Sequence, residues 1–138
     1  MLTLDEFIAQ VAGDVGGVLL LGDDEPARRK VAERIHAARN RPASLFFVVP
    51  AGASKSALAA PIGATVYLED GSTLSFEEQD ALLQSTQASD PWKIIAGVEA
   101  RDELHEAVAE ERLRPAIYHL ISAHFYDFDK NLAATARR

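Results

Sequence analysis

The segment Gly17-Val-Leu-Leu-Leu-Gly-Asp-Asp-Glu-Pro26 decides the fold. Its first half is a short, continuous apolar run, which is typical of a strand buried on both faces of a parallel sheet. Its second half is a turn with a strong helix start. Asp24 can cap a helix, Pro26 suits the first turn, and acidic residues favour the positive end of the helix dipole. The pattern predicts a strand over 17–21 and a helix that ends near Ala38.

The rest of the chain alternates between helix and strand patterns. A capping-box sequence at Thr3-Leu-Asp-Glu6 predicts an opening helix that ends near Gly13. Further strands are expected over 44–49, 65–68, 92–98 and 121–125, a loop over 51–63, and helices over 76–87, 101–111 and 115–120. Strands separated by helices favour parallel pairing with right-handed crossovers. The predicted fold class is therefore a three-layer α/β sheet of about five strands, formed by a single domain over residues 1–138 with a frayed tail over 127–138.

Composition narrows the function classes. No apolar run approaches the ~20 residues that a membrane span needs, and the acidic N-terminus lacks the basic start of a signal peptide. The absence of cysteine excludes disulfides, thiolate metal sites and thiol nucleophiles. A net charge of −7 argues against a general nucleic-acid binder. We therefore expect a cytoplasmic domain with neither a membrane nor a nucleic acid as partner.

Three groups of short motifs occur in order between Val18 and Phe125: Ala32-Glu-Arg-Ile-His36 with Asn40-Arg41 and Leu45-Phe46; Thr65-Val-Tyr-Leu-Glu-Asp70 with Glu78-Gln79 and Leu82-Leu83-Gln84; and Ile94-Ile-Ala96 with Arg101-Asp102, Arg112-Leu-Arg114 and Ile117-Tyr118. They resemble the stretches ARAIH…S-R…PF, TLFLDE…Q…LL and RIIAATNRDL…GRFRxDLYYRL of the AAA+ domains of sigma-54-dependent transcriptional activators. The resemblance implies a P-loop NTPase-like core with the strands in the order fifth, first, fourth, third, second. It also implies a role in bacterial transcription regulation, in the setting of response regulators and two-component systems.

The phosphate loop departs from that family. Where the family has Walker A, G-E-S-G-T-G-K, this chain has Gly22-Asp-Asp-Glu-Pro-Ala-Arg28. A phosphate cradle needs glycines so that backbone N–H groups can converge on the anion, yet only Gly22 remains and Pro26 removes one donor. Three consecutive acids stand where the triphosphate would lie, and Arg28 replaces the lysine. We expect that this loop does not hold ATP in the family's manner.

Other functional parts of the family differ too. Glu69-Asp70 inverts the Walker B pair, and misplacing both carboxylates would weaken magnesium binding and water activation. These two residues can equally be ordinary acids at the end of a strand. The sigma-contact loop has no counterpart in 51–64, and the sensor asparagine and the helical lid subdomain are not evident. We therefore predict no catalytic residue, no metal site and no cofactor, with ATP and Mg²⁺ bound only if the degenerate site at Gly22, Arg28, Glu69 and Asp70 survives.

Arg112 and Arg114 match the arginines that reach a neighbouring subunit's nucleotide in the family's ring. The simpler interpretation is a solvated basic pair flanked by Glu110 and Glu111. The prediction that follows is a non-hydrolysing relative of these ATPase domains that acts by protein–protein contact. Its partner would be an active AAA+ activator or a second copy of the chain.

Two alternatives remain. The acidic turn after the first strand also resembles the acidic pair of response-regulator receivers, which would make Asp70 a phosphoacceptor. Val98 and Glu99 stand where a receiver has serine or threonine, and Lys130 lies beyond the expected end of the last strand. The other alternative is a residual ATP-binding sensor without turnover.

Overall fold

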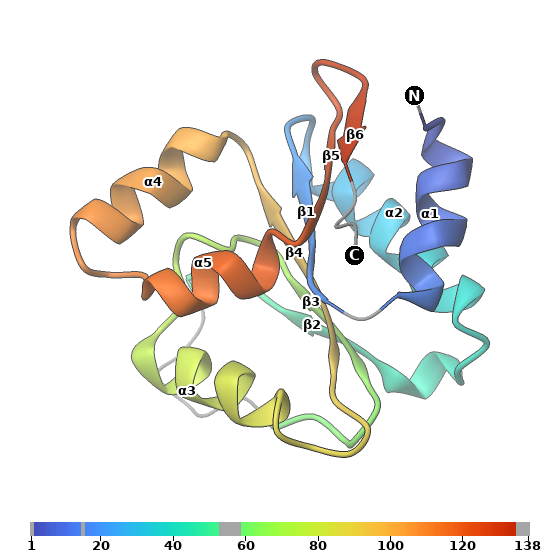
Figure 1. Cartoon of the computed structure of the whole chain (residues 1–138), viewed down its shortest axis with the longest axis horizontal. Helices are drawn as coiled ribbons and strands as arrows, with labels where there is room; N and C mark the ends of the chain where they lie inside the picture. The colour runs from blue at the N-terminus through green and yellow to red at the C-terminus, as the bar shows by residue number, and fades with distance from the viewer. Residues whose placement is uncertain (1, 15, 53–58, 135–138) are drawn as a thin grey trace.

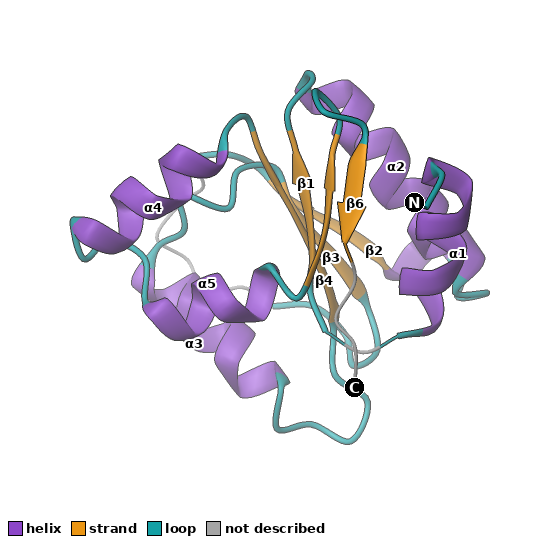
Figure 2. Ribbon diagram, turned by 45° about the horizontal axis from the view of Figure 1, so that its top comes forward, coloured by secondary structure: helices purple, strands orange, loops and turns teal. Residues whose placement is uncertain are grey.

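The computed structural model describes residues 2–14, 16–52 and 59–134. Figures 1 and 2 show one sheet between two layers of helices. The strands are β1 (Val18–Leu21), β2 (Phe46–Val49), β3 (Thr65–Leu68), β4 (Lys93–Val98), β5 (His124–Asp127) and β6 (Leu132–Ala134), in the spatial order β2-β3-β4-β1-β5-β6. β1 to β5 pair in parallel, whereas β6 is antiparallel to β5. The α/β class and the predicted order of the first five strands are confirmed.

The helices are divided between the two faces of the sheet. α1 (Leu4–Gly13) and α2 (Glu25–Ala38) cover one face, while α3 (Phe76–Ser85), α4 (Arg101–Ala109) and α5 (Pro115–Ile121) cover the other (Figure 1). Local signals start the first three of these helices. Thr3 and Ser75 each form a complete capping box, and the Asp24 carboxylate accepts a hydrogen bond from the N–H of Ala27 at 2.9 Å.

The core consists of two apolar clusters, one on each face of the sheet. Every residue of β1, β3 and β4 is buried, as expected for central strands covered by helices on both sides. On the α1–α2 side the main apolar contacts come from Phe7, Val11, Val31, Ile35, Val18, Leu20 and Ile95. On the other side they come from Leu19, Leu68, Leu82, Leu104, Leu113, Ile117 and Ile121. Each fully buried aliphatic side chain stabilises the fold by roughly 1.5–3 kcal/mol.

The C-terminal region corrects two predictions. The fifth strand begins at His124 rather than at Ile121, because Ile121 is the fully buried last residue of α5. The expected frayed tail instead turns back and forms a sixth strand, in which Leu132 pairs with Asp127. Residues 135–138 of that tail, and 53–58 of the expected loop, lie outside the described residues.

The second predicted strand is also shorter than expected. Residues 43–45 form a 3₁₀ turn, and the strand begins only at Phe46. No helix within the described ranges is both long enough and apolar enough to span a membrane.

Candidate functional site at the carboxyl edge of the sheet

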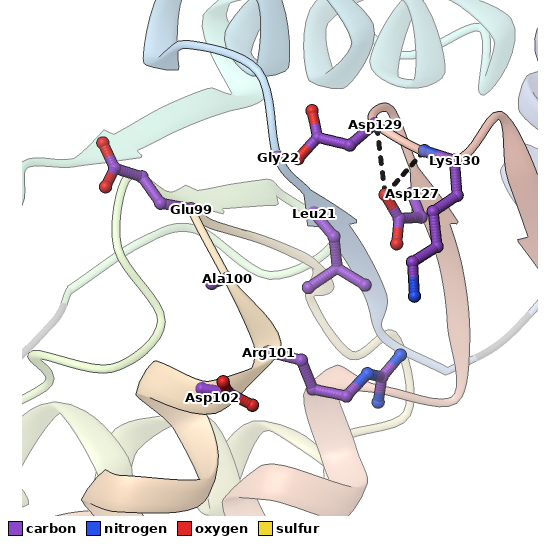
Figure 3. A pocket seen from close by; sticks show the side chains of 9 residues that line it. All are labelled: Leu21, Gly22, Glu99, Ala100, Arg101, Asp102, Asp127, Asp129 and Lys130. Carbon is purple, nitrogen blue, oxygen red and sulfur yellow. Dashed lines mark hydrogen bonds between the residues drawn. The ribbon is translucent and has the colours of Figure 1, made fainter.

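A pocket of about 350 Å³ opens at the carboxyl edge of the sheet. The loops that follow β1, β4 and β5 form it, and Figure 3 shows its lining residues: Leu21, Gly22, Glu99, Ala100, Arg101, Asp102, Asp127, Asp129 and Lys130. β1 continues into α2 on one face of the sheet, whereas its neighbour β4 continues into α4 on the other face. Such a switch point is where open α/β sheets commonly bind ligands. We define this cavity as the carboxyl-edge pocket.

The β1–α2 loop has two residues in the left-handed region. Gly22 has φ +86° and Asp23 has φ +56°, a conformation that glycine adopts freely and aspartate tolerates. A Cβ at position 22 would lie 2.6 Å from Oδ2 of Asp129, so the carboxylate of Asp129 sits directly against this glycine. Position 22 therefore favours glycine chiefly for its dihedral angle, and a side chain there would also displace the exposed carboxylate of Asp129.

The backbone N–H groups of this loop already have acceptors. The N–H of Asp23 donates to Oδ1 of Asp129 at 3.4 Å, and that of Asp24 donates to Oδ1 of Asp23 at 2.8 Å. The N–H of Ala27 donates to Oδ1 of Asp24, and that of Gly22 donates to the carbonyl of Val98 at 3.0 Å. A phosphate cradle presents such N–H groups to the anion. In this loop, carboxylates of the chain itself take most of those donors.

Arg28 points into the fold and away from the pocket. Its side chain is 5% exposed, and its Nη1 donates to the carbonyls of Gly22 at 3.0 Å and Asp23 at 2.9 Å. A Cβ at Gly97 would come within 2.8 Å of its Nε, so the glycine in β4 makes room for the guanidinium. This Nε has no hydrogen-bond partner among the described residues. The arginine predicted to replace a phosphate-binding lysine thus holds the loop by its carbonyl oxygens.

Glu69 and Asp70 lie at the end of β3, as predicted, but outside the pocket. Oε1 of Glu69 accepts from the N–H of Ala51 at 3.0 Å, and its other oxygen is paired with Arg29. Oδ1 of Asp70 accepts from both the N–H and the hydroxyl of Ser72, at 2.9 and 2.6 Å. Both acids therefore stabilise loops, which agrees with the simpler interpretation of the pair.

Arg29 is a residue that the sequence patterns did not single out. It lies one turn after Glu25 and forms an ion pair with it at 3.2 Å, in addition to its contact with Glu69. Glu25 also accepts a hydrogen bond from the hydroxyl of Tyr67 at 3.0 Å. Burial, together with this hydrogen bond, raises the pKa of Tyr67. This network joins α2 to β3 behind the acidic turn.

The pocket itself is mixed in charge, with more acids than bases. Oδ1 of Asp127 accepts from the N–H groups of Asp129 at 3.0 Å and Lys130 at 3.2 Å (Figure 3). The guanidinium of Arg101 lies 4.8 Å from the ring centre of Phe125, which fixes it as one wall. The sequence patterns did not predict that Asp127 and Asp129 line a pocket, because 127–138 were assigned to a frayed tail. β5 ends at Asp127, so Lys130 lies three residues beyond it, in the turn that leads to β6.

This arrangement does not support the receiver alternative. Receiver domains have the strand order 2-1-3-4-5, in which β1 and β3 are adjacent. Here β4 separates β1 from β3, and Asp70 at the end of β3 does not line the pocket. The acidic turn and the candidate phosphoacceptor are therefore not brought into one site.

Arg112 and Arg114 lie in the α4–α5 connection, apart from the pocket. Arg112 pairs with Glu110 at 2.8 Å, and its Nη1 donates to the carbonyl of Ser72 at 3.2 Å. Arg114 pairs with Asp80 of α3 and stacks over Phe76 at 5.2 Å. Their side chains are 50% and 37% exposed. Ion pairs this exposed contribute only about 0–1 kcal/mol, so solvent or a partner can replace them.

Across 2–14, 16–52 and 59–134, no group of three or more histidine or acidic side chains is arranged to hold a metal ion. Comparison with known proteins adds no family assignment. No protein-family model matches this chain, and no curated protein matches it significantly.

Proposed function

We propose that this chain is a non-hydrolysing relative of the ATPase core of sigma-54-dependent activators, and that it acts in the bacterial cytoplasm by protein–protein contact in transcription regulation. One observation carries the proposal. In the β1–α2 loop, N–H groups that would bind phosphate donate to Asp23, Asp24 and Asp129, while carbonyl oxygens hold Arg28. The strand order expected from the family resemblance supports the same reading.

Electrostatics oppose phosphate binding at this loop. A triphosphate would have to displace carboxylates from their N–H donors and remain close to them. At ~5 Å each contact between like unit charges costs about 1 kcal/mol even in water, and more where water is excluded. Glu69 is paired with Arg29, and one oxygen of Asp70 accepts from Ser72, so a magnesium ion here would compete with contacts that already hold both acids.

The contact surface in this proposal is the α4–α5 connection with Arg112 and Arg114. Their present partners, Glu110 and Asp80, are exposed carboxylates that a partner's anionic group can replace. In an assembly with an active AAA+ activator, that group would be a phosphate of the nucleotide bound to the neighbouring subunit. A second copy of this chain is the other candidate partner.

Calorimetric titration with Mg-ATP, Mg-ADP and non-hydrolysable analogues tests the nucleotide part. We expect no binding heat and no change in melting temperature in 3 mM nucleotide. A dissociation constant near 100 μM would instead stabilise the fold by about 2 kcal/mol at that concentration. Such binding at the carboxyl edge would overturn the proposal in favour of a nucleotide sensor without turnover.

Analytical ultracentrifugation with a purified sigma-54 activator ATPase domain tests the contact part. We expect a complex with the native chain that is lost in the double variant Arg112→Ala/Arg114→Ala. The matched control is Arg34→Ala, which removes another exposed ion pair, with Asp5, on the opposite helical layer. If neither the activator domain nor a second copy of the chain associates, the contact part is wrong.

A further inference from the structure

A second pocket, of about 290 Å³, lies at the opposite, amino edge of the sheet. The ends of α1 and α2 and the start of β4 enclose it, and these segments lie together at that end of the sheet in Figure 1. Three cationic side chains, Arg39, Arg41 and Lys93, line it, together with Asp14, Asp90 and Trp92. We define this cavity as the amino-edge pocket.

Lys93 is a buried cation in this pocket. Its side chain is 5% exposed, and its Nζ donates to the carbonyls of Asp14 at 2.8 Å and Gly16 at 3.0 Å. An ammonium group has three donors, and residues 2–14, 16–52 and 59–134 supply acceptors for two of them. Within the described residues no carboxylate forms an ion pair with it. Burial and the charge of Arg39 lower the pKa of Lys93 to about 8, which leaves it mostly protonated at neutral pH.

Arg39 is the second cation of this pocket without an ion pair among the described residues. Its Nη1 donates to Oγ1 of Thr65, and no ion pair within the described residues includes it. Burial and the charge of Arg41 lower its pKa. A guanidinium has five donors, and the hydroxyl of Thr65 is the acceptor that the described part of the chain offers it, so most of its donors have none there.

A hydrogen-bond chain fixes the position of Arg39. Nε2 of His36 lies 2.8 Å from the carbonyl of Pro42, which can only accept, so this nitrogen carries the proton. Nδ1 of His36 lies 2.6 Å from Oγ1 of Thr65, and the same oxygen accepts a hydrogen bond from Arg39. The side chain of Arg39 is therefore held before any ligand arrives, which lowers the entropic cost of binding.

The two acids at this pocket offset only part of the positive charge. The carboxylate of Asp90 accepts hydrogen bonds from both terminal nitrogens of Arg41, at 3.1 and 3.3 Å. These bonds lower the pKa of Asp90. Asp14 is exposed and contributes its backbone carbonyl to Lys93. A small anion could accept from the remaining donors of Arg39 and Lys93. Trp92 also borders this pocket, while its side chain packs against the apolar cluster on the α3–α5 side and its Nε1 donates to the carbonyl of Pro61 at 3.0 Å.

We propose that the amino-edge pocket binds a small oxyanion, a phosphate or carboxylate group of a small molecule, between Arg39 and Lys93 and beside Trp92. This site is separate from the carboxyl-edge pocket and does not depend on the proposed function. It also runs against the overall charge of the chain, −7, so general attraction of anions by the surface cannot explain binding there.

Trp92 is the only tryptophan in the chain and borders both this pocket and a cavity beside α3, so its fluorescence is followed together with calorimetry. The full chain is titrated with inorganic phosphate, pyrophosphate and citrate, at an ionic strength held constant with potassium chloride. We expect a saturable change with at least one of them. Preference for phosphate or for citrate identifies the chemical source of the oxyanion. A change that chloride reproduces, or no saturable change with any of the three, would overturn the proposal.

Arg39→Gln is the decisive variant, because Arg39 is only half-buried and its loss should leave the fold intact. We expect it to weaken binding about tenfold or more, as for loss of a charge-assisted hydrogen bond. Arg34→Gln, in the same helix but away from the pocket, should bind as the native chain does. Equal affinity in all three proteins would contradict the proposed site.

A second measurement does not depend on a variant that might unfold. Saturating phosphate should raise the pKa of the Lys93 ammonium, followed by NMR of its side chain, because an adjacent anion favours the charged form. An unchanged titration curve would contradict contact between the anion and Lys93. If Mg-ATP produces heat that Arg39→Gln abolishes, the binding belongs to the amino edge, and the proposal for the carboxyl edge stands.

Discussion

At the carboxyl edge of the sheet, the carboxylates of Asp23, Asp24 and Asp129 accept hydrogen bonds from backbone N–H groups. At the amino edge, Arg39 and Lys93 donate to a hydroxyl and to backbone carbonyls instead. At the carboxyl edge, backbone N–H donors are therefore paired with carboxylates of the chain itself. At the amino edge, Arg39 and Lys93 are not paired with a carboxylate of the described residues.

This difference matters because ligand sites in open α/β sheets are expected at the carboxyl edge. Here that edge has a switch point and a pocket, but its loop is already occupied by acidic side chains. A fold therefore indicates where a site can form, and the side chains decide which charge it accepts. The same sheet carries its better anion pocket at the other end.

The largest expected effect tests how tightly the acidic loop is built. Gly22→Ala should lower the free energy of unfolding by about 2 kcal/mol, because φ is +86° and the exposed carboxylate of Asp129 must turn away from the new Cβ. Gly52→Ala is the matched control: its φ is +66°, with no atom of a described residue within 4 Å of the new Cβ, so only about 1 kcal/mol should be lost. Urea denaturation measures both. Equal losses would mean that Asp129 does not pack against the loop.

The next effect tests the buried cation at the amino edge. Lys93 has a pKa of about 8 in the folded chain against 10.5 when unfolded, so between these values the unfolded chain binds more protons. The free energy of unfolding should therefore rise with pH, by about 1–2 kcal/mol from pH 8 to 9.5. Arg39, whose charge also acts on Lys93, keeps its proton throughout this interval.

Denaturant unfolding at several pH values measures this slope, and Lys93→Met should remove it. Above pH 10 the raised pKa of Tyr67 acts in the opposite direction, because the unfolded chain then loses that proton first. Saturating phosphate should also flatten the slope if it raises the pKa of Lys93. A native chain whose stability falls from pH 8 to 9.5 would contradict the assignment of a buried, charged lysine.

Local signals account for what the sequence predicted well. Thr3, Asp24 and Ser75 cap their helices through contacts three residues away, which a short window of sequence contains. Ile121 could not be assigned in this way, because a buried apolar residue fits either the end of a helix or a strand. β6 depends on pairing with β5 and buries little of its own surface, so its sequence carries almost no strand pattern.

The two pockets depend even more on contacts between residues that are far apart in the sequence. The positions of Gly22, Glu69 and Asp70 at strand ends were predictable, because parallel strands end at one edge. The inward direction of Arg28 was not, since it depends on the space left by Gly97 in another strand. The amino-edge cluster joins Arg39 in α2 to Lys93 in β4. No motif spacing connects two such distant residues.

A smaller effect compares single carboxylates at the two edges. Asp24→Ala should cost about 1 kcal/mol of unfolding free energy, because the N-cap of α2 loses its bond to the N–H of Ala27. The helix should fray at its first turn, and amide hydrogen exchange of Ala27 should become faster. Asp24→Asn keeps an acceptor oxygen and should retain most of the stability. If both variants lose the same amount, the charge and not the hydrogen bond holds the cap.

The smallest effect on stability belongs to Asp14, at the other edge. Its exposed carboxylate makes no side-chain cap, and it stands at the negative end of the α1 dipole. Asp14→Asn should therefore change the free energy of unfolding by less than about 0.5 kcal/mol. The same change removes an acid from the amino-edge pocket, so phosphate should bind about two- to threefold more tightly at pH 6.5. Fluorescence titration of Trp92 measures this gain, and weaker binding would mean that Asp14 itself helps to hold the ligand.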